Sequence, residues 1–205
     1  MLLIWPYNLH ARKRPELFPI GLGYLLTSLQ KNGLYGHILD CCVRDLPPDS
    51  DDFKRELVLL RPNVVGISWW SNNTPMVKQT IRVVKQVLPQ ACIVSGGPHP
   101  TAYGDALLSA MSELDFLFFG EAEEGFPKLG RLLSEGENGT NTIDFSLLGD
   151  IPGLIYRNDK GSVRKNKQSF EKNLDALGAI DYDLLQLATY QSRGYSYGGK
   201  AIRDN

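Results

Sequence analysis

The feature that most constrains this chain is the alternation of short apolar segments with single amphipathic segments. The apolar segments are rich in branched residues and recur about every 25 to 30 residues. The five expected strands are residues 2–5, 37–40, 64–68, 92–95 and 116–119. Single helices between strands are typical of right-handed βαβ units, which build parallel sheets covered on both faces. We therefore expect an α/β fold with a doubly wound, five-stranded parallel sheet, flavodoxin-like or Rossmann-like, in the order 2-1-3-4-5.

The expected helices carry recognisable start and stop signals. Leucines at positions 22, 25, 26 and 29 share one face of the first helix, and Gly33 is a natural C-terminal stop. Side-chain oxygens at the beginning of a helix can accept hydrogen bonds from its free backbone N–H groups. The expected caps of the next three helices are Asp49 or Ser50, then Thr74, then Thr101.

The composition changes after Gly136. Residues 137–142 are polar and rich in Gly and Asn, which predicts a linker or exposed loop. Residues 154–157 and 162–165 flank a turn-forming segment and predict a β-hairpin. Residues 174–187 show no obvious core of their own. The expected organisation is an α/β domain over residues 1–140, followed by a hairpin and connector over residues 141–205.

Composition argues against several classes of protein. A net charge of −1 over 205 residues gives no electrostatic case for nucleic-acid binding. No apolar run approaches the roughly 20 residues of a membrane span. The three cysteines form neither a disulfide framework nor a metal spacing, and the three histidines are scattered. We expect a cytoplasmic protein without a membrane partner or a metal site of its own.

The expected strand ends carry uncharged groups that are small or aromatic. They include Trp5, Ser68, Trp69, Trp70, Gly96, Gly97, His99 and Gly120. Open α/β sheets bind ligands at the carboxyl ends of their strands, and paired glycines let a backbone approach something bulky. Taken singly, each residue has a structural explanation as a turn former or core filler. Their joint placement at four strand ends favours a large, flat, mostly neutral ligand.

Common catalytic signatures are missing from this edge. No phosphate-binding loop ending in Gly-Lys-Ser/Thr occurs, and Gly21 and Gly23 are followed by Leu26 where a dinucleotide fingerprint needs Gly or Ala. A phospho-acceptor module would need acids after the first and third strands, where this chain has Trp5-Pro6 and Ser68-Trp69. The sequence therefore nominates no catalytic residue.

Several segments together resemble a known family. They are residues 19–25, 66–68, 96–101, 115–123, 152–157 and 174–185. In this order they are similar to the N-terminal cobalamin-binding domain of cobalamin-dependent radical S-adenosylmethionine enzymes. The resemblance covers nearly the whole chain. It implies a cofactor site formed by Ser68, Trp69, Trp70, Gly96, Gly97, His99, Thr101, Gly120 and Glu121.

One departure from cobalamin folds in general concerns the cobalt ligand. Their Asp-x-His-x-x-Gly signature follows the second strand, and here that stretch begins at Asp40. Cys42 stands at the histidine position and Asp45 at the glycine position. The resemblance therefore implies a base-off mode, in which the nucleotide tail is detached from cobalt and no protein histidine replaces it.

A second departure concerns the radical chemistry. The family's iron–sulfur domain needs a Cys-x-x-x-Cys-x-x-Cys spacing, which this sequence lacks. We therefore expect this chain to bind cobalamin without catalysing, as part of a longer methyl-transfer or cyclase-type parent. A four-iron cluster and S-adenosylmethionine would belong to a radical domain in cis. Dimerisation through the C-terminal segment stays open.

Two further interpretations remain alternatives. A degenerate, cofactor-free domain could serve as a docking or substrate-access module. The cobalt-ligating histidine is missing, and Trp70 stands where the Ser-x-Leu motif of cobalamin folds has leucine. A flavin or nucleotide binder ranks last, because residues 6–9 supply no Ser/Thr-rich phosphate loop after the first strand.

Overall fold

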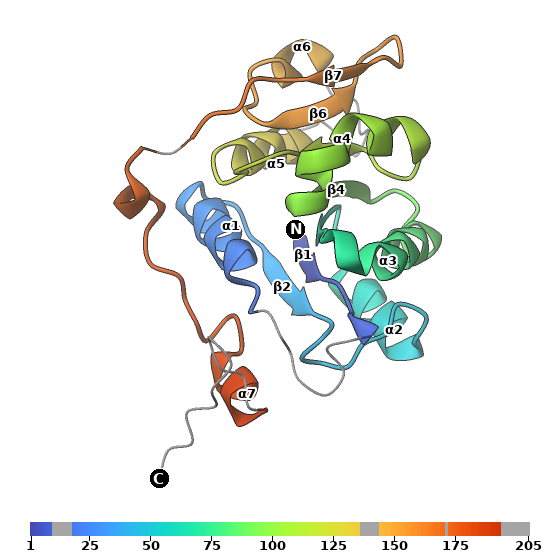
Figure 1. The fold of residues 1–205 in the computed structure, drawn as a ribbon, viewed down its shortest axis with the longest axis vertical. Helices are drawn as coiled ribbons and strands as arrows, with labels where there is room; N and C mark the ends of the chain where they lie inside the picture. Colours follow the sequence, from blue (N-terminus) through green and yellow to red (C-terminus); the bar gives the residue numbers. More distant parts are fainter. Residues whose placement is uncertain (10–17, 136–143, 171, 194–205) are drawn as a thin grey trace.

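The computed structural model describes residues 1–9, 18–135, 144–170 and 172–193 (Figure 1). Its sheet contains five parallel strands in the order β2-β1-β3-β4-β5. These strands are β1 (Leu2–Trp5), β2 (His37–Asp40), β3 (Val64–Ser68), β4 (Cys92–Gly96) and β5 (Phe116–Phe118). Each lies within a residue or two of its expected position, because continuous apolar runs suit strands that are buried on both faces.

The sheet has seven strands, so the expected count of five was wrong. The hairpin strands β6 (Leu154–Arg157) and β7 (Val163–Lys165) extend it beyond β5 as antiparallel strands. An uncovered β5 would expose a row of unpaired backbone groups, and β6 pairs with it instead. The predicted domain boundary at residue 140 and the predicted linker lie outside the described residues.

Helices cover both faces of the sheet (Figure 1). On one face lie α2 (Asp51–Leu60), α3 (Thr74–Val87) and α4 (Pro98–Ala110), and on the other α1 (Ile20–Lys31), α5 (Gly125–Glu135) and the short α6 (Phe145–Leu148). The remaining elements are η2 (Ser71–Asn73), η4 (Leu174–Leu177) and α7 (Leu187–Ser192). In the described part of the chain, no helix combines the length and apolar character needed to cross a membrane.

The helix starts confirm one expected cap and correct two. Ser50 caps α2, since its Oγ accepts a hydrogen bond from the Phe53 N–H at 3.2 Å. Asn73, not Thr74, precedes α3. Gly97 precedes α4, and Thr101 lies inside the first turn, where its hydroxyl donates to the Gly97 carbonyl at 2.8 Å. The backbone φ of Gly97 is +108°, a conformation open to glycine, and it lets the helix begin four residues earlier than expected.

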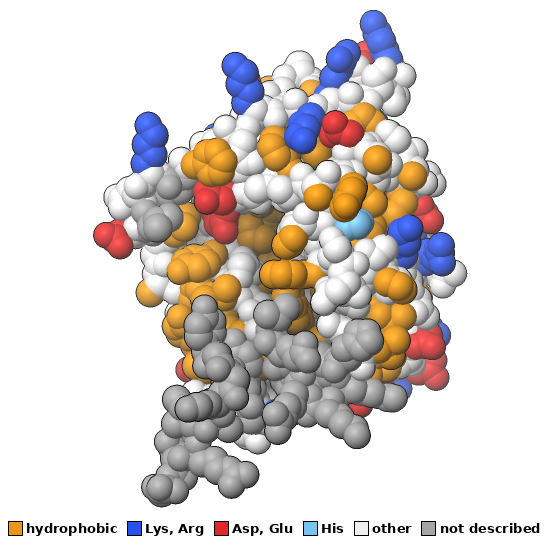
Figure 2. Space-filling view, in the orientation of Figure 1, with side chains coloured by type: hydrophobic (Ala, Val, Ile, Leu, Met, Phe, Trp, Pro, Cys, Tyr) orange, Lys and Arg blue, Asp and Glu red, His pale blue; other side chains and the backbone are white. Residues whose placement is uncertain are grey.

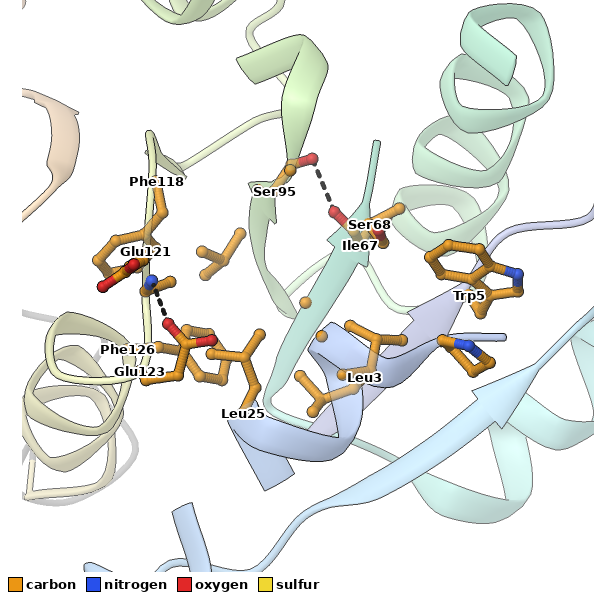
Figure 3. Close-up of a pocket in the computed structure, with 18 of the residues that line it drawn as sticks. Leu3, Trp5, Leu25, Ile67, Ser68, Ser95, Phe118, Glu121, Glu123 and Phe126 are labelled. Carbon is orange, nitrogen blue, oxygen red and sulfur yellow. Dashed lines mark hydrogen bonds between the residues drawn. The ribbon is translucent and has the colours of Figure 1, made fainter. Parts of the chain in front are cut away.

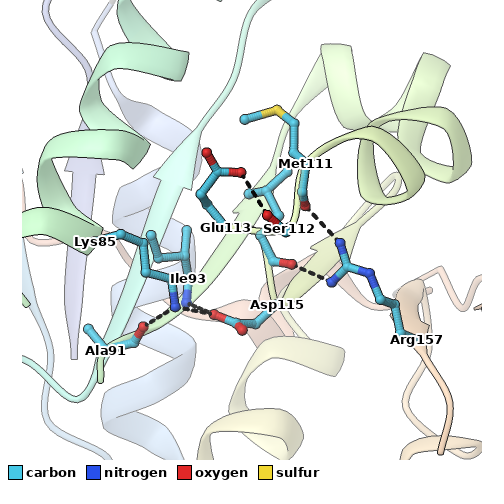
Figure 4. Close-up of polar contacts among 9 residues, drawn as sticks. Lys85, Ala91, Ile93, Met111, Ser112, Glu113, Asp115 and Arg157 are labelled. Carbon is cyan, nitrogen blue, oxygen red and sulfur yellow. Dashed lines mark hydrogen bonds and ion pairs between the residues drawn. The ribbon is translucent and has the colours of Figure 1, made fainter. Parts of the chain in front are cut away.

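Two polar clusters hold the β5 end of the sheet together (Figure 4). Asp115 Oδ2 accepts hydrogen bonds from the Ile93 N–H at 2.7 Å and from Lys85 Nζ at 3.0 Å. Arg157 on β6 donates to the carbonyls of Met111 and Leu114, each at 2.7 Å. These carbonyls follow the end of α4, so the guanidinium fastens the hairpin to that helix.

A candidate cofactor cavity at the strand ends

A cavity of about 290 Å³ lies at the carboxyl ends of β1, β3, β4 and β5 (Figure 3). Helices α1 and α5 form its other walls, so the cavity lies between the sheet and these two helices. Carboxyl ends of neighbouring parallel strands meet at one edge, which is where open α/β sheets bind ligands. The fold therefore places the cavity where the sequence predicts a site.

Two central strands carry a glycine at their ends on this face of the sheet, and one of the two glycines leaves open space. Alternation along β3 and β4 turns Gly66 and Gly96 toward α1 and α5, while Ile67 packs in the core on the opposite face. A Cβ at Gly66 would lie 2.8 Å from Leu3 Cδ2. A Cβ at Gly96 would meet nothing closer than Phe118 Cβ at 3.7 Å. The space above Gly96 is therefore open to a ligand.

The walls of the cavity are largely apolar and aromatic. Phe118 and Phe126 meet edge to face, with ring centroids 6.0 Å apart and planes at 79°. Further apolar lining comes from Leu3, Trp5, Phe18, Ile20, Leu22, Leu25 and Val94. Burial of a flat aromatic group against such walls is favourable, because it removes apolar surface from water on both partners.

Polar groups gather around the loop that follows β5. The Gly120 N–H donates to Thr101 Oγ1 at 2.9 Å, and the Ala122 N–H donates to Glu123 Oε2 at 2.9 Å. Ser28 Oγ donates to the Glu123 carbonyl at 2.6 Å, which ties this loop to α1. Ser68 adds a hydroxyl from the end of β3. A mostly apolar cavity with a few placed polar groups is typical of cofactor and small-molecule sites.

Six of the nine predicted site residues line this cavity, and three do not. The lining residues are Ser68, Trp70, Gly96, Gly97, Gly120 and Glu121. Trp69, His99 and Thr101 are not among the residues that line it. Thr101 still reaches the lining indirectly, through its hydrogen bond with Gly120. Contact of any of the nine with a cofactor stays a prediction.

The two adjacent tryptophans have opposite environments. Trp69 is fully buried, and its indole N–H donates to Thr74 Oγ1 at 3.0 Å. Its ring stacks on His99, with centroids 4.9 Å apart. Burial and the nearby Lys78 lower the pKa of His99, whose Nδ1 lies 3.0 Å from Ser71 Oγ. Trp70 is 40% exposed at the cavity, so it is the tryptophan that a ligand can reach.

Gly97 is required by the backbone before any ligand is considered. Its φ is +108°, and a Cβ there would lie 3.0 Å from the Trp69 carbonyl oxygen. A side chain would therefore strain the loop itself.

Figure 2 shows hydrophobic side chains gathered toward the middle of the face drawn, with Lys and Arg side chains at its periphery.

Sequence reasoning missed much of the lining. Gly66, Leu3, Phe118 and Phe126 were not predicted as site residues, nor was the wall formed by residues 18–25. Strand periodicity held a signal for one of them, since Gly66 stands two residues before Ser68 and must share its face. No comparable local signal marks α1 and α5 as cavity walls, because that depends on how the helices pack.

The loop after β2 presents neither an imidazole nor a thiolate. Cys42 stands at the position where the cobalamin signature has histidine, and its Sγ donates to the Pro6 carbonyl at 3.3 Å. Burial and the neighbouring Asp40 raise the pKa of the Cys42 thiol to about 12, so it stays protonated at neutral pH. Among the described residues, no group of His, Cys, Asp and Glu side chains is arranged to hold a metal ion.

Comparison with known families agrees with a cofactor-binding domain built on a parallel α/β sheet. The family model of the B12 binding domain matches residues 11–130, which is more than half of the chain. The chain therefore belongs to the B12-binding domain family, and the resemblance seen in the sequence is confirmed at this level.

Curated relatives include longer enzymes. The "Uncharacterized methyltransferase PH0819" of Pyrococcus horikoshii is 26% identical over 88% of this chain and 37% of its own length. The cytidylyl-2-hydroxyethylphosphonate methyltransferase of Streptomyces wedmorensis is 31% identical over 72% of this chain and 29% of its own length. The anaerobic magnesium-protoporphyrin IX monomethyl ester cyclase of Synechocystis is 27% identical over 67% and 25%. The chain thus spans between a quarter and somewhat over a third of these relatives.

Among solved structures, the fold matches that of the cobalamin-dependent S-adenosylmethionine radical enzyme OxsB. The OxsB structure with aqua-cobalamin bound superposes with a TM-score of 0.75 and 14% identity. The match covers 95% of this chain and 25% of OxsB. At this identity the likeness concerns the fold alone.

Proposed function

We propose that this chain binds cobalamin in the base-off form, with the nucleotide tail inserted between the sheet and helices α1 and α5. The observation that carries the proposal is the open, apolar cavity at the strand ends of a B12-binding domain. Bound cobalamin would supply a cobalt centre for methyl or electron transfer. The chain's own residues bind and orient the cofactor.

The cavity suits the tail of the cofactor and not its corrin ring. A volume of about 290 Å³ lies at the low end for ligand pockets, so the smaller tail is the part of the cofactor that we assign to it. Gly96 leaves the slot open, and Phe118 and Phe126 offer aromatic walls. The corrin would then lie over the mouth, near the exposed side chain of Trp70.

The loop after β2 supports cobalt ligation without a protein histidine. Cys42 replaces that histidine, and its thiol is protonated and donates to Pro6. A neutral thiol committed to a carbonyl is a poor cobalt ligand, since thiolate is the ligating form. The nine predicted site residues keep their proposed roles, with Trp69, His99 and Thr101 acting through the residues they contact.

The parent enzyme is also part of the proposal. The chain spans between a quarter and somewhat over a third of the length of these three relatives, two of which are named as methyltransferases and one as a cyclase. We propose a cytoplasmic parent of methyl-transfer or cyclase type, with a radical S-adenosylmethionine domain in cis that holds the four-iron cluster. Dimerisation through the segment after Thr142 remains a hypothesis.

The cofactor-free alternative would require a cavity closed by the protein itself. The groups near the strand ends that could close it are Trp69, Trp70 and the basic residues 12–14. Trp69 packs away from the cavity in the core of the opposite face, and Trp70 lies at its lining. Residues 12–14 lie outside the described residues.

A binding experiment with hydroxocobalamin tests the proposal. The 205-residue chain should shift the corrin absorption spectrum and co-elute with the corrinoid on gel filtration. Gly96→Leu should weaken binding about 100-fold, because the added side chain fills the slot while its Cβ meets no close neighbour. Gly149→Leu is the matched control, since Gly149 is exposed and remote from the cavity.

Two results would refute the proposal. The first is a wild-type chain that elutes free of hydroxocobalamin with an unchanged corrin spectrum. The second is a Gly96→Leu variant that binds as tightly as Gly149→Leu. Gly97 is unsuitable for this test, because a side chain there strains the loop whether or not a cofactor binds.

A further inference from the structure

The C-terminal connector, defined here as residues 178–193, packs against the rest of the molecule. Ile180, Leu185 and Tyr190 are 9%, 1% and 0% exposed. The sequence predicted no core of its own for residues 174–187, and the buried side chains of this segment pack against other parts of the molecule. In Figure 1 the connector runs beside α1 and ends in α7.

Helix α1 has no side chain where the connector crosses it. A Cβ at Gly23 would lie 2.8 Å from both Ile180 Cγ2 and Leu185 Cδ1. The connector therefore reaches the backbone of α1 in van der Waals contact. Just before the helix, Phe18 stacks on Tyr182 with centroids 6.1 Å apart and meets Tyr190 edge to face at 5.0 Å.

One buried hydrogen bond anchors the far end of the connector. The Tyr190 hydroxyl donates to Asp40 Oδ2, and Asp40 is only 1% exposed at the end of β2. Asp40 Oδ1 accepts from the N–H groups of Cys42 and Val43 at 2.9 and 3.0 Å. Loss of the Tyr190 hydroxyl would remove a charge-assisted bond and leave a buried oxygen without this donor.

The same part of α1 forms a wall of the cofactor cavity. Residues 18–22 and Leu25 line the cavity, and Phe18 touches both the cavity and Tyr190. Among the described residues, the beginning of α1 lies between the connector and the cavity. A change in how the connector is held therefore reaches the cavity through one layer of residues.

We propose that Tyr190 is a positioning residue for the cofactor cavity. By bonding to Asp40, it clamps the connector onto α1 and holds the wall formed by residues 18–25 in place. The inference rests on the proposed binding of cobalamin. Because coupling between two sites is reciprocal, the bound tail and the docked connector stabilise one another. The segment that leads out of this domain therefore senses whether the cavity is filled.

The test compares two variants that each lose one hydroxyl. Tyr190→Phe keeps the ring against Phe18 and removes the hydroxyl that donates to Asp40. Tyr35→Phe is the matched control, because Tyr35 is 91% exposed and far from the cavity lining. In Tyr190→Phe we expect faster amide hydrogen exchange in residues 19–25 and 178–190 without cofactor. We also expect hydroxocobalamin affinity to fall about tenfold, which corresponds to about 1.4 kcal/mol.

A rescue variant separates positioning from general destabilisation. Asp40→Asn keeps an oxygen for the N–H groups of Cys42 and Val43, and its amide can donate to the Tyr190 oxygen. We expect exchange in residues 19–25 and cobalamin affinity close to those of the wild type. The rise in melting temperature on adding hydroxocobalamin should be smaller in Tyr190→Phe than in wild type, Asp40→Asn or Tyr35→Phe.

The outcomes distinguish this inference from the proposed function. If the wild type binds hydroxocobalamin and Tyr190→Phe matches it in affinity and exchange, the inference is overturned and the function stands. If Tyr190→Phe melts lower but gains as much stability from cobalamin as the wild type, Tyr190 is a structural contact only, which also overturns it. If the wild type does not bind, the function fails, and the exchange data alone decide whether Tyr190 holds the α1 wall.

Discussion

The two faces of the sheet are built from the same strands but differ in how fully their alternating side chains fill the space under the helices. The face under α2, α3 and α4 is filled, with Phe53, Ile67 and Trp69 at most 2% exposed. The face under α1 and α5 is hollow at the strand ends, where Gly66 and Gly96 contribute no side chains. The site on the hollow face is made chiefly by omitting side chains, which fits a domain that holds a cofactor carrying its own chemistry.

Truncation of one large side chain on each face should give the largest contrast. Ile67→Ala empties a site on the filled face, and we expect it to lower the free energy of unfolding by about 2–5 kcal/mol. Leu25→Ala enlarges an existing cavity at a partly exposed position, so we expect about 1 kcal/mol or less. Urea unfolding of the two variants measures both costs. Equal costs would show that the two faces are packed alike.

Replacing a glycine by valine on each face should show the same difference in packing, with a smaller effect on stability. A Cβ at Gly104 would lie 2.3 Å from Ile155 Cδ1, a side chain that is fully buried, so Gly104→Val should cost about 1–3 kcal/mol. The nearest neighbour of a Cβ at Gly96 is 3.7 Å away, so Gly96→Val should cost less than about 1 kcal/mol. Thermal unfolding without cofactor compares them. A greater loss in Gly96→Val would mean that the hollow is already filled.

The sequence was sufficient for features that depend on local patterns. The parallel strands, the Gly33 stop and the Ser50 cap follow from apolar runs, a left-handed glycine and a side-chain acceptor. The edge that carries the cavity follows from parallel connections, because all of these strands then end on one side. These features need no knowledge of which helix packs against which.

Features set by long-range packing could not be predicted in this way. Strand alternation ends at Ser68, so it does not say which of Trp69 and Trp70 turns inward. Thr101 looked like a cap because the left-handed φ of Gly97 has no unique sequence signal. The pairing of Tyr190 with Asp40 joins residues 150 positions apart, and the addition of the hairpin to the sheet depends on the exposed edge of β5.

The smallest expected effect concerns the buried carboxylate at the edge of the hollow face. Burial raises the pKa of Asp40, and hydrogen bonds from Tyr190, Val43 and Cys42, with the charge of Arg193, oppose that rise only in part. The folded protein therefore takes up this proton at a higher pH than the unfolded chain, whose pKa is near 3.8. As the pH falls from 7 through the raised pKa toward 3.8, folding gains stability from this group.

Asparagine cannot gain that stability. We therefore expect the free energy of unfolding of the wild type to rise relative to that of Asp40→Asn as the pH falls. Urea unfolding of both proteins from pH 7 to pH 4.5 measures the difference at each pH, and acid effects elsewhere in the chain cancel in it. A shift toward Asp40→Asn would mean that the hydrogen bonds outweigh burial and lower the pKa instead. The hydrogen bond from Tyr190 would then stabilise the charged form of the Asp40 carboxylate. At neutral pH this would strengthen the contact that holds the connector on α1.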